Sequence, residues 1–182
     1  LICYIDTLQL QAQGNGLFNW SPGYNILADN TPQPLVFPKI TTWYRISLNE
    51  NGCINKDSIR VRVADSVTLD AGRDTLICAN DPVKLSPQTD GLQYQWTPAL
   101  YLNNNTLKNP IATPPVTTTY TIRSIIGKCY AEDNVSITAI PYPLANAGND
   151  TIICFEDTAQ LFGITDGIQF KWTPVNTLLN SN

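Results

Sequence analysis

The segment Asp70–Pro98, DAGRDTLICANDPVKLSPQTDGLQYQWTP, decides the fold, because it recurs as Asn146–Pro174, NAGNDTIICFEDTAQLFGITDGIQFKWTP. Between positions 71–98 and 147–174, 15 of 28 residues are identical. Tryptophans mark the same period of 76 residues, at Trp20, Trp96 and Trp172. A fixed period of this length indicates a tandem array of one supersecondary unit.

The period divides the 182 residues into one complete unit and two incomplete ones. We expect an N-terminally truncated repeat at 1–66, a complete repeat at 67–143 and a C-terminally truncated repeat at 144–182. The first repeat opens at Leu1-Ile2-Cys3, which matches Leu76-Ile77-Cys78, so its lead-in is missing. The pattern therefore predicts a window on a longer array.

Short β-rich segments separated by turn residues predict the architecture. Residues 41–48 and 117–122 are dense in β-branched and aromatic residues, and residues 58–63 alternate strictly. Turn signals stand at 80–82 and at 127–128, and no segment keeps a helical period. We expect an all-β chain of tandem antiparallel β-sandwich repeats, each of about 76 residues.

Composition argues against several classes of function. The net charge of −4 and the pI near 4.6 disfavour nucleic acid, which is bound by clustered Lys and Arg. No run of 18 apolar residues is present, so we expect no membrane insertion. The chain has no His, no G-x-S-x-G and no Gly-rich phosphate loop, so we expect no enzyme and no catalytic residue.

Two cysteines per complete unit, in register, predict a disulfide within each repeat. The expected pairs are Cys3–Cys53 and Cys78–Cys129, and Cys154 would find its partner beyond the chain end, near position 205. A zinc site is the alternative, but His and closely spaced Cys pairs are missing. Disulfides in turn imply an oxidising compartment.

The tryptophans divide into two kinds. The three that recur in every unit are expected in the core, as in immunoglobulin-like domains. Trp43 differs, because the second repeat has Thr119 at that position. Trp43 is therefore a candidate ligand contact.

Acidic residues recur around the first cysteine of each unit. Calcium at the domain joints is one interpretation, with Asp74, Asp81, Asp150 and Asp157 as candidate ligands. Turn-forming or hydrogen-bonding Asp, which would also explain Asp6, is the alternative. No other cofactor is expected.

Four motifs carry a resemblance that covers the whole chain. They are Ala-Gly-x-Asp-Thr-x-x-Cys, Tyr-x-Trp-Thr-Pro, the segment Asn109–Thr121, and Lys-Cys-x-x-x-Asp at 128–133. The chain resembles the PKD-like or Ig-like repeats of giant surface proteins of Bacteroidota, including gliding-motility adhesins exported by the type IX secretion system. The first repeat departs from the pattern at residues 31–34 and at Trp43.

The resemblance also implies O-glycosylation at Asp-(Ser/Thr)-apolar tripeptides, which this chain has six times. The candidate sites are Thr7, Ser58, Ser66, Thr75, Thr151 and Thr158.

These observations predict a structural or adhesive array of a large secreted cell-surface adhesin or filament, active in gliding or attachment. Its expected partners are neighbouring repeats of the same chain, surface polysaccharide or other surface proteins, and the secretion machinery in transit. Its expected location is the extracellular bacterial cell surface. The alternatives are a spacer of a secreted polysaccharide-degrading enzyme and repeats that themselves bind carbohydrate.

Overall fold

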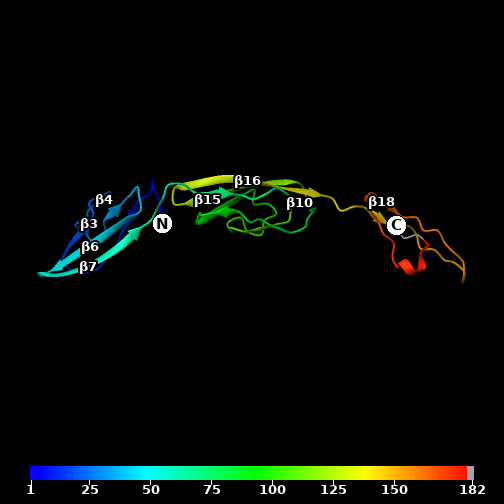
Figure 1. Ribbon diagram of the computed structural model, residues 1–182, viewed down its shortest axis with the longest axis horizontal. Helices are drawn as coiled ribbons and strands as arrows, with labels where there is room; N and C mark the ends of the chain where they lie inside the picture. Colours follow the sequence, from blue (N-terminus) through cyan, green and yellow to red (C-terminus); the bar gives the residue numbers. More distant parts are fainter. Residues whose placement is uncertain (180–182) are drawn as a thin grey trace. The chain divides into compact units, whose positions relative to one another are not determined.

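The computed structural model describes residues 1–179, and strands dominate them (Figure 1). Contacts divide the chain into two units, Leu1–Ala139 and Ile140–Asn182. The first unit contains the repeat at 1–66 (repeat 1) and most of the repeat at 67–143 (repeat 2), each with its own hydrophobic cluster. In the second unit the strands are β17 (Ala145–Asn146) and β18 (Ile164–Thr165), followed by the 3-10 turn η1 (Val175–Thr177).

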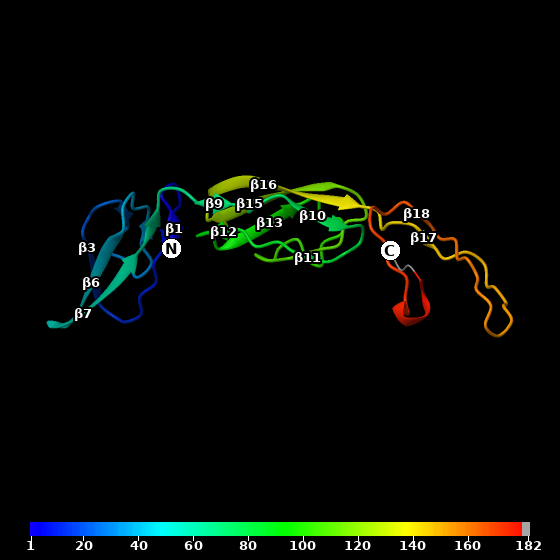
Figure 2. The ribbon, with the colours of Figure 1, turned by 45° about the vertical axis from the view of Figure 1, so that its right-hand side comes forward.

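Repeat 1 is a small sandwich of two antiparallel sheets. Its main sheet, in the order β3-β6-β7, contains β3 (Leu17–Ser21) and the long hairpin of β6 (Thr42–Glu50) and β7 (Cys53–Val61), seen in cyan in Figure 2. The facing sheet contains β2 (Leu8–Gln9), β5 (Leu35–Val36) and β4 (Ile26–Leu27). Trp20, Tyr44 and Val36 are buried between the two sheets, as a core between two faces requires.

Repeat 2 has the same plan with one more strand in the main sheet. The order is β10-β16-β15-β13, with β10 (Thr75–Cys78), β16 (Cys129–Ile140), β15 (Thr118–Ile126) and β13 (Gln93–Thr97). The pairs β11 (Val83–Lys84) with β14 (Ile111–Ala112) and β9 (Leu69–Asp70) with β12 (Gln88–Thr89) complete the repeat. The fold is thus all-β, with tandem Ig-like sandwiches.

Both long hairpins turn through two residues whose conformation the sequence favours. Asn51 and Gly52 have φ values of 51° and 90°, typical of a type I′ turn that matches the twist of the strands. Glu50 pairs with Cys53, and Ile126 pairs with Cys129, so the two hairpins have the same register. The hairpin strands therefore extend beyond the predicted limits. In repeat 1 the added part of β7 is exposed, whereas in repeat 2 the added part of β15 includes the buried Ser124 and Ile126.

The repeats differ at one edge of the main sheet. In repeat 2 the segment before β10 lies against β16: the Ala71 N–H donates to the Asp133 carboxylate at 2.8 Å, and Val135 is only 3% exposed. In repeat 1 the counterpart of Val135 is Ile59, which is 44% exposed beside a groove of about 410 Å³. Repeat 1 therefore has an open edge at Ile59, where repeat 2 has a covered one.

Candidate functional site

The junction between repeats 1 and 2 is built around a disulfide that joins Cys3 to Cys129. Cys3 lies in β1 (Ile2–Cys3), which pairs in parallel with β8 (Val63–Ala64) at the end of repeat 1. Cys129 begins β16, directly after the hairpin turn of repeat 2. The bond therefore links two repeats covalently and does not close a loop within one.

The predicted pairs Cys3–Cys53 and Cys78–Cys129 are wrong. Cys3 pairs with Ala64, whereas Cys53 stands at the opposite end of β7, and ten residues at about 3.3 Å each separate Cys53 from Val63. A disulfide needs Cα atoms within about 7 Å. Cys53, Cys78 and Cys154 are thiols in the described chain, and a partner of Cys154 stays a prediction.

The Asp6 carboxylate fastens the two sides of this junction. One oxygen accepts a hydrogen bond from the Cys3 N–H at 2.8 Å, and the other accepts one from the Lys128 N–H at 3.0 Å. Asp6 is only 8% exposed, and a Cβ at Gly127 would overlap its carboxylate. Hydrogen bonds to an ionised acceptor are among the stronger ones. Asp6, with the space that Gly127 leaves for it, therefore holds Cys3 and Cys129 close to each other.

The recurring Asp residues form turns and hydrogen bonds, which was the alternative to calcium binding. The N–H of Asp6, Asp81 and Asp157 donates to the carbonyl of the cysteine three residues earlier at 2.9, 3.0 and 3.1 Å. Asp74 accepts from the Ser136 N–H at 2.8 Å. Within residues 1–179, no three Asp, Glu, Cys or His side chains gather at one point where they could hold a metal ion, so calcium gains no support from the geometry.

The recurring tryptophans are core residues in the two larger repeats, as predicted. Trp20 is 5% and Trp96 is 0% exposed, and their indole N–H groups donate to Thr31 and Leu107 carbonyls at 3.0 Å. Trp172 is partly buried in the second unit. Trp43 is 50% exposed, on the outer face of β6, as a ligand contact requires.

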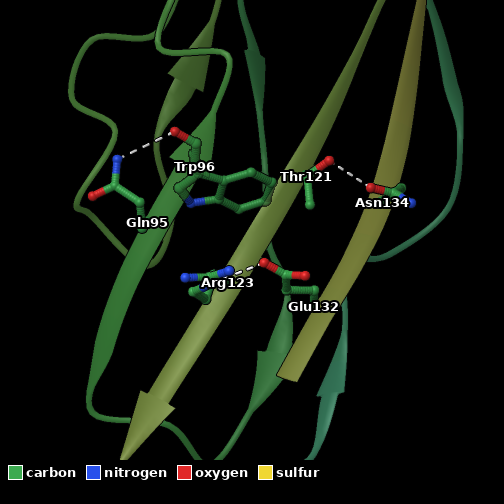
Figure 3. Close-up of polar contacts among 6 residues, drawn as sticks. All are labelled: Gln95, Trp96, Thr121, Arg123, Glu132 and Asn134. Carbon is green, nitrogen blue, oxygen red and sulfur yellow. Dashed lines mark hydrogen bonds and ion pairs between the residues drawn. The ribbon is translucent and has the colours of Figure 1, made fainter. Parts of the chain in front are cut away.

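Trp43 lies in an outer face that differs in charge between the repeats. In repeat 1, Arg60 stacks over the Trp43 ring at 6.0 Å, and Arg45 and Lys56 share this face. Figure 3 shows the matching face of repeat 2, where Thr121 donates to Asn134 at 2.6 Å and Arg123 pairs with Glu132 at 2.7 Å. The face is self-paired in repeat 2 and cationic in repeat 1.

Two buried tyrosines were not singled out from the sequence. The Tyr44 hydroxyl donates to the Tyr24 carbonyl at 2.9 Å, and the Tyr120 hydroxyl donates to the Leu100 carbonyl at 3.1 Å. Burial, with a smaller effect of Tyr24, raises the pKa of Tyr44 to about 12, and burial with Tyr101 raises the pKa of Tyr120. Their spacing of 76 residues inside matched strands is the signal that could have identified them.

The candidate glycosylation sites are exposed in the described chain, as enzymatic modification requires; they are Thr7, Ser58, Ser66, Thr75, Thr151 and Thr158. In residues 1–179 we find no helix of the length and apolarity that crossing a membrane demands.

Comparisons with solved structures find similarity to several multi-domain chains. The extracellular domains 3–5 of Drosophila OTK are 13% identical, with a TM-score of 0.39, over 76% of this chain and 58% of theirs. The titin I-band fragment I67–I69 is 10% identical, with a TM-score of 0.43, over 78% of this chain and 62% of that fragment. Immunoglobulin domains 1–5 of Sidekick-1 are 12% identical, with a TM-score of 0.34, over 78% of this chain and 38% of that structure.

The chain thus spans less than two thirds of each of these structures. No protein-family model matches the chain. No curated protein matches it. Identities and TM-scores this low give no information about activity. The Ig-like fold is inferred from the chain's own sheets and repeats.

Proposed function

We propose that this chain is the structural and adhesive repeat array of a large secreted surface adhesin or filament. One observation carries the proposal: the disulfide from Cys3 to Cys129 joins two successive repeats instead of stapling one. Such a bond makes neighbouring repeats cooperative, which a stalk needs and an isolated binding domain does not. In an array, the stability of each repeat is the sum of its own contribution and that of the contacts with its neighbours.

The compartment follows from the same bond. Disulfides persist mainly in oxidising surroundings, which supports export to the cell surface. The repeat motifs add the origin that we propose: a Bacteroidota surface protein of the gliding-motility type, delivered by the type IX system. The exposed Asp-Ser and Asp-Thr sites fit O-glycosylation of such a protein.

Surface labelling and deletion test this proposal. Antibodies against residues 1–182 should label intact cells, and removal of the array should abolish attachment or gliding without loss of polysaccharide hydrolysis. Labelling only of permeabilised cells would contradict the proposal. Loss of hydrolysis with attachment intact would instead establish the alternative, a spacer within a secreted polysaccharide-degrading enzyme.

A second candidate function, carbohydrate binding, is favoured by the outer face of repeat 1. There Trp43 offers an exposed aromatic ring beside Arg45, Lys56 and Arg60, which have no carboxylate among their cross-strand partners. Aromatic rings stack on sugar faces, and guanidinium groups bind carboxylates in two-point contacts. An anionic polysaccharide such as a polyuronate is therefore the ligand class that fits this face.

The chain supplies its own control residues for this candidate. Trp43→Thr and Arg60→Ser introduce the residues that repeat 2 carries at the same positions, so the fold should tolerate both. We expect the parent chain to be retarded in a polyuronate gel but not in a neutral glucan gel, and the double variant to migrate freely in both. Equal retardation of parent and variant would remove this candidate.

A further inference from the structure

The turn that carries Cys3 occurs again at Cys78. In both places the aspartate three residues later donates its N–H to the cysteine carbonyl, at 2.9 Å for Asp6 and 3.0 Å for Asp81. Cys3 is oxidised to Cys129, whereas Cys78 is a partly exposed thiol. Cys78 therefore holds in repeat 2 the place that Cys3 holds in repeat 1, without its bond.

The junction at Cys3 indicates which residues a hairpin must contain to form a disulfide with Cys78. The hairpin that meets Cys3 needs a glycine at Gly127, because its φ is 55° and a Cβ there would overlap Asp6. It also needs the Lys128 N–H for the carboxylate, and then the cysteine itself. The hairpin of repeat 1 has Asn51 in the glycine position, so Cys53 does not match this requirement.

We propose that Cys78 and Asp81 form half of a second inter-repeat disulfide, whose other half is a Gly-Lys-Cys hairpin of a further repeat like residues 126–129. The inference rests on the proposed function, since it requires an array with another such repeat. The first cysteine of each repeat would then bond to the hairpin of the next. The array becomes a chain of covalently linked neighbours.

The bond needs a two-electron oxidant, which a disulfide of the oxidised glutathione type supplies. One cysteine thiolate attacks this disulfide and releases a glutathione thiolate. The second cysteine thiolate then attacks the mixed disulfide and releases the other glutathione. Two thiols lose their protons and two electrons, and the oxidant leaves as two reduced molecules.

Insertion of one period tests the pairing rule in the full chain. A copy of residues 64–139 is placed after Ala139, so that Cys78 is followed by a repeat with a Gly-Lys-Cys hairpin, and the protein is refolded in a glutathione redox buffer. Non-reducing peptide mapping should find Cys78 joined to the inserted copy of Cys129, with Cys3–Cys129 retained. An inserted hairpin cysteine bonded within its own repeat, a Cys78 that stays alkylatable, or loss of both bonds would overturn the proposal.

A matched variant separates this junction from chance oxidation. Gly127→Asn in the inserted copy alone gives its hairpin the residue that repeat 1 has there. We expect the fraction of Cys78 that is bridged to fall about tenfold at a limiting ratio of oxidised to reduced glutathione. The asparagine side chain would occupy the space of the Asp81 carboxylate, which could then no longer accept the hydrogen bond of the hairpin. An unchanged fraction would show that the thiols pair without the proposed site. The array proposal itself could still fail or succeed by surface labelling.

Discussion

Asp6 and Lys128 are 122 positions apart, yet the Asp6 carboxylate accepts the Lys128 backbone N–H at 3.0 Å while it also accepts that of Cys3. Its burial makes this carboxylate the polar centre of the junction. Asp6→Ala leaves two backbone N–H groups without their acceptor. We expect it to destabilise the first unit by about 1–3 kcal/mol.

Chemical denaturation of both proteins, with the disulfide intact, measures this cost. Asp65→Asn is the matched control, because Asp65 is an exposed acidic residue of the same unit. A midpoint that shifts equally in the two variants would mean that Asp6 acts only through net charge.

The Cys3–Cys129 bond should make repeats 1 and 2 unfold together. In the chain-entropy model a loop of about 100 residues contributes about 4.7 kcal/mol, and this bond spans a sequence separation of 126. We expect Cys3→Ser with Cys129→Ser to lower the melting temperature and to split one calorimetric transition into two. Cys53→Ser, which removes an exposed thiol, should change neither.

The open edge of repeat 1 should accept the strand that covers repeat 2. We expect a fusion of the sequence of residues 66–75 in front of Leu1 to cover Ile59 and to place an alanine N–H on Asp57, as Ala71 does on Asp133. Full burial of an exposed Ile side chain contributes about 1.5–3 kcal/mol, and Ile59 is 44% exposed, so covering it should stabilise repeat 1 by about 1 kcal/mol.

Hydrogen exchange of β7 is the measurement, and a fusion with aspartate in place of the alanine is the control, because a charge would enter the groove. Equal protection of β7 with either fusion would indicate that the edge does not recognise this strand.

Tyr44 gives repeat 1 an alkaline limit. Its pKa is near 10 in an unfolded chain and about 12 when buried, so the neutral hydroxyl favours the folded state. This contribution is complete below pH 10 and is lost as the pH rises toward 12. Tyr44→Phe should flatten the pH dependence over this window, at a cost near neutral pH of about 1 kcal/mol for the lost hydrogen bond.

Short-time fluorescence unfolding between pH 9 and 12 can follow this, and Tyr130→Phe, at an exposed side chain of repeat 2, is the control. A loss of stability that is as steep in Tyr44→Phe as in the parent would contradict the role of this hydroxyl.

The sequence predicted the sandwich and its core because both depend on the nearest neighbours along each strand. The alternation around Trp20 and Trp96 directs these rings inward wherever the strand lies, and the structure buries both. The recurrence of Asp after the first cysteine was also visible, and the turn it forms is local.

The disulfide could not be predicted for a different reason. A periodic sequence does not distinguish the hairpin cysteine of one repeat from that of the next, so Cys53 and Cys129 are equivalent candidates for Cys3. The choice depends on β1, which pairs in parallel with β8 and so lies at the end of β7 remote from Cys53. The groove beside Ile59 likewise depends on which segments lie against β7 in space, which no pattern within repeat 1 encodes.

The bond between Cys3 and Cys129 also decides where tension would travel. If the chain is pulled from its ends, the force enters at Cys3, crosses the two sulfur atoms and leaves at Cys129, and the residues between them carry none of it. At about 3.4 Å per residue, the separation of 126 residues between the two cysteines corresponds to roughly 430 Å of extended polypeptide that cannot be stretched while the bond is intact. Both repeats could melt under strain and the tether would hardly lengthen, so reduction, and not unfolding, is the event that would release their length.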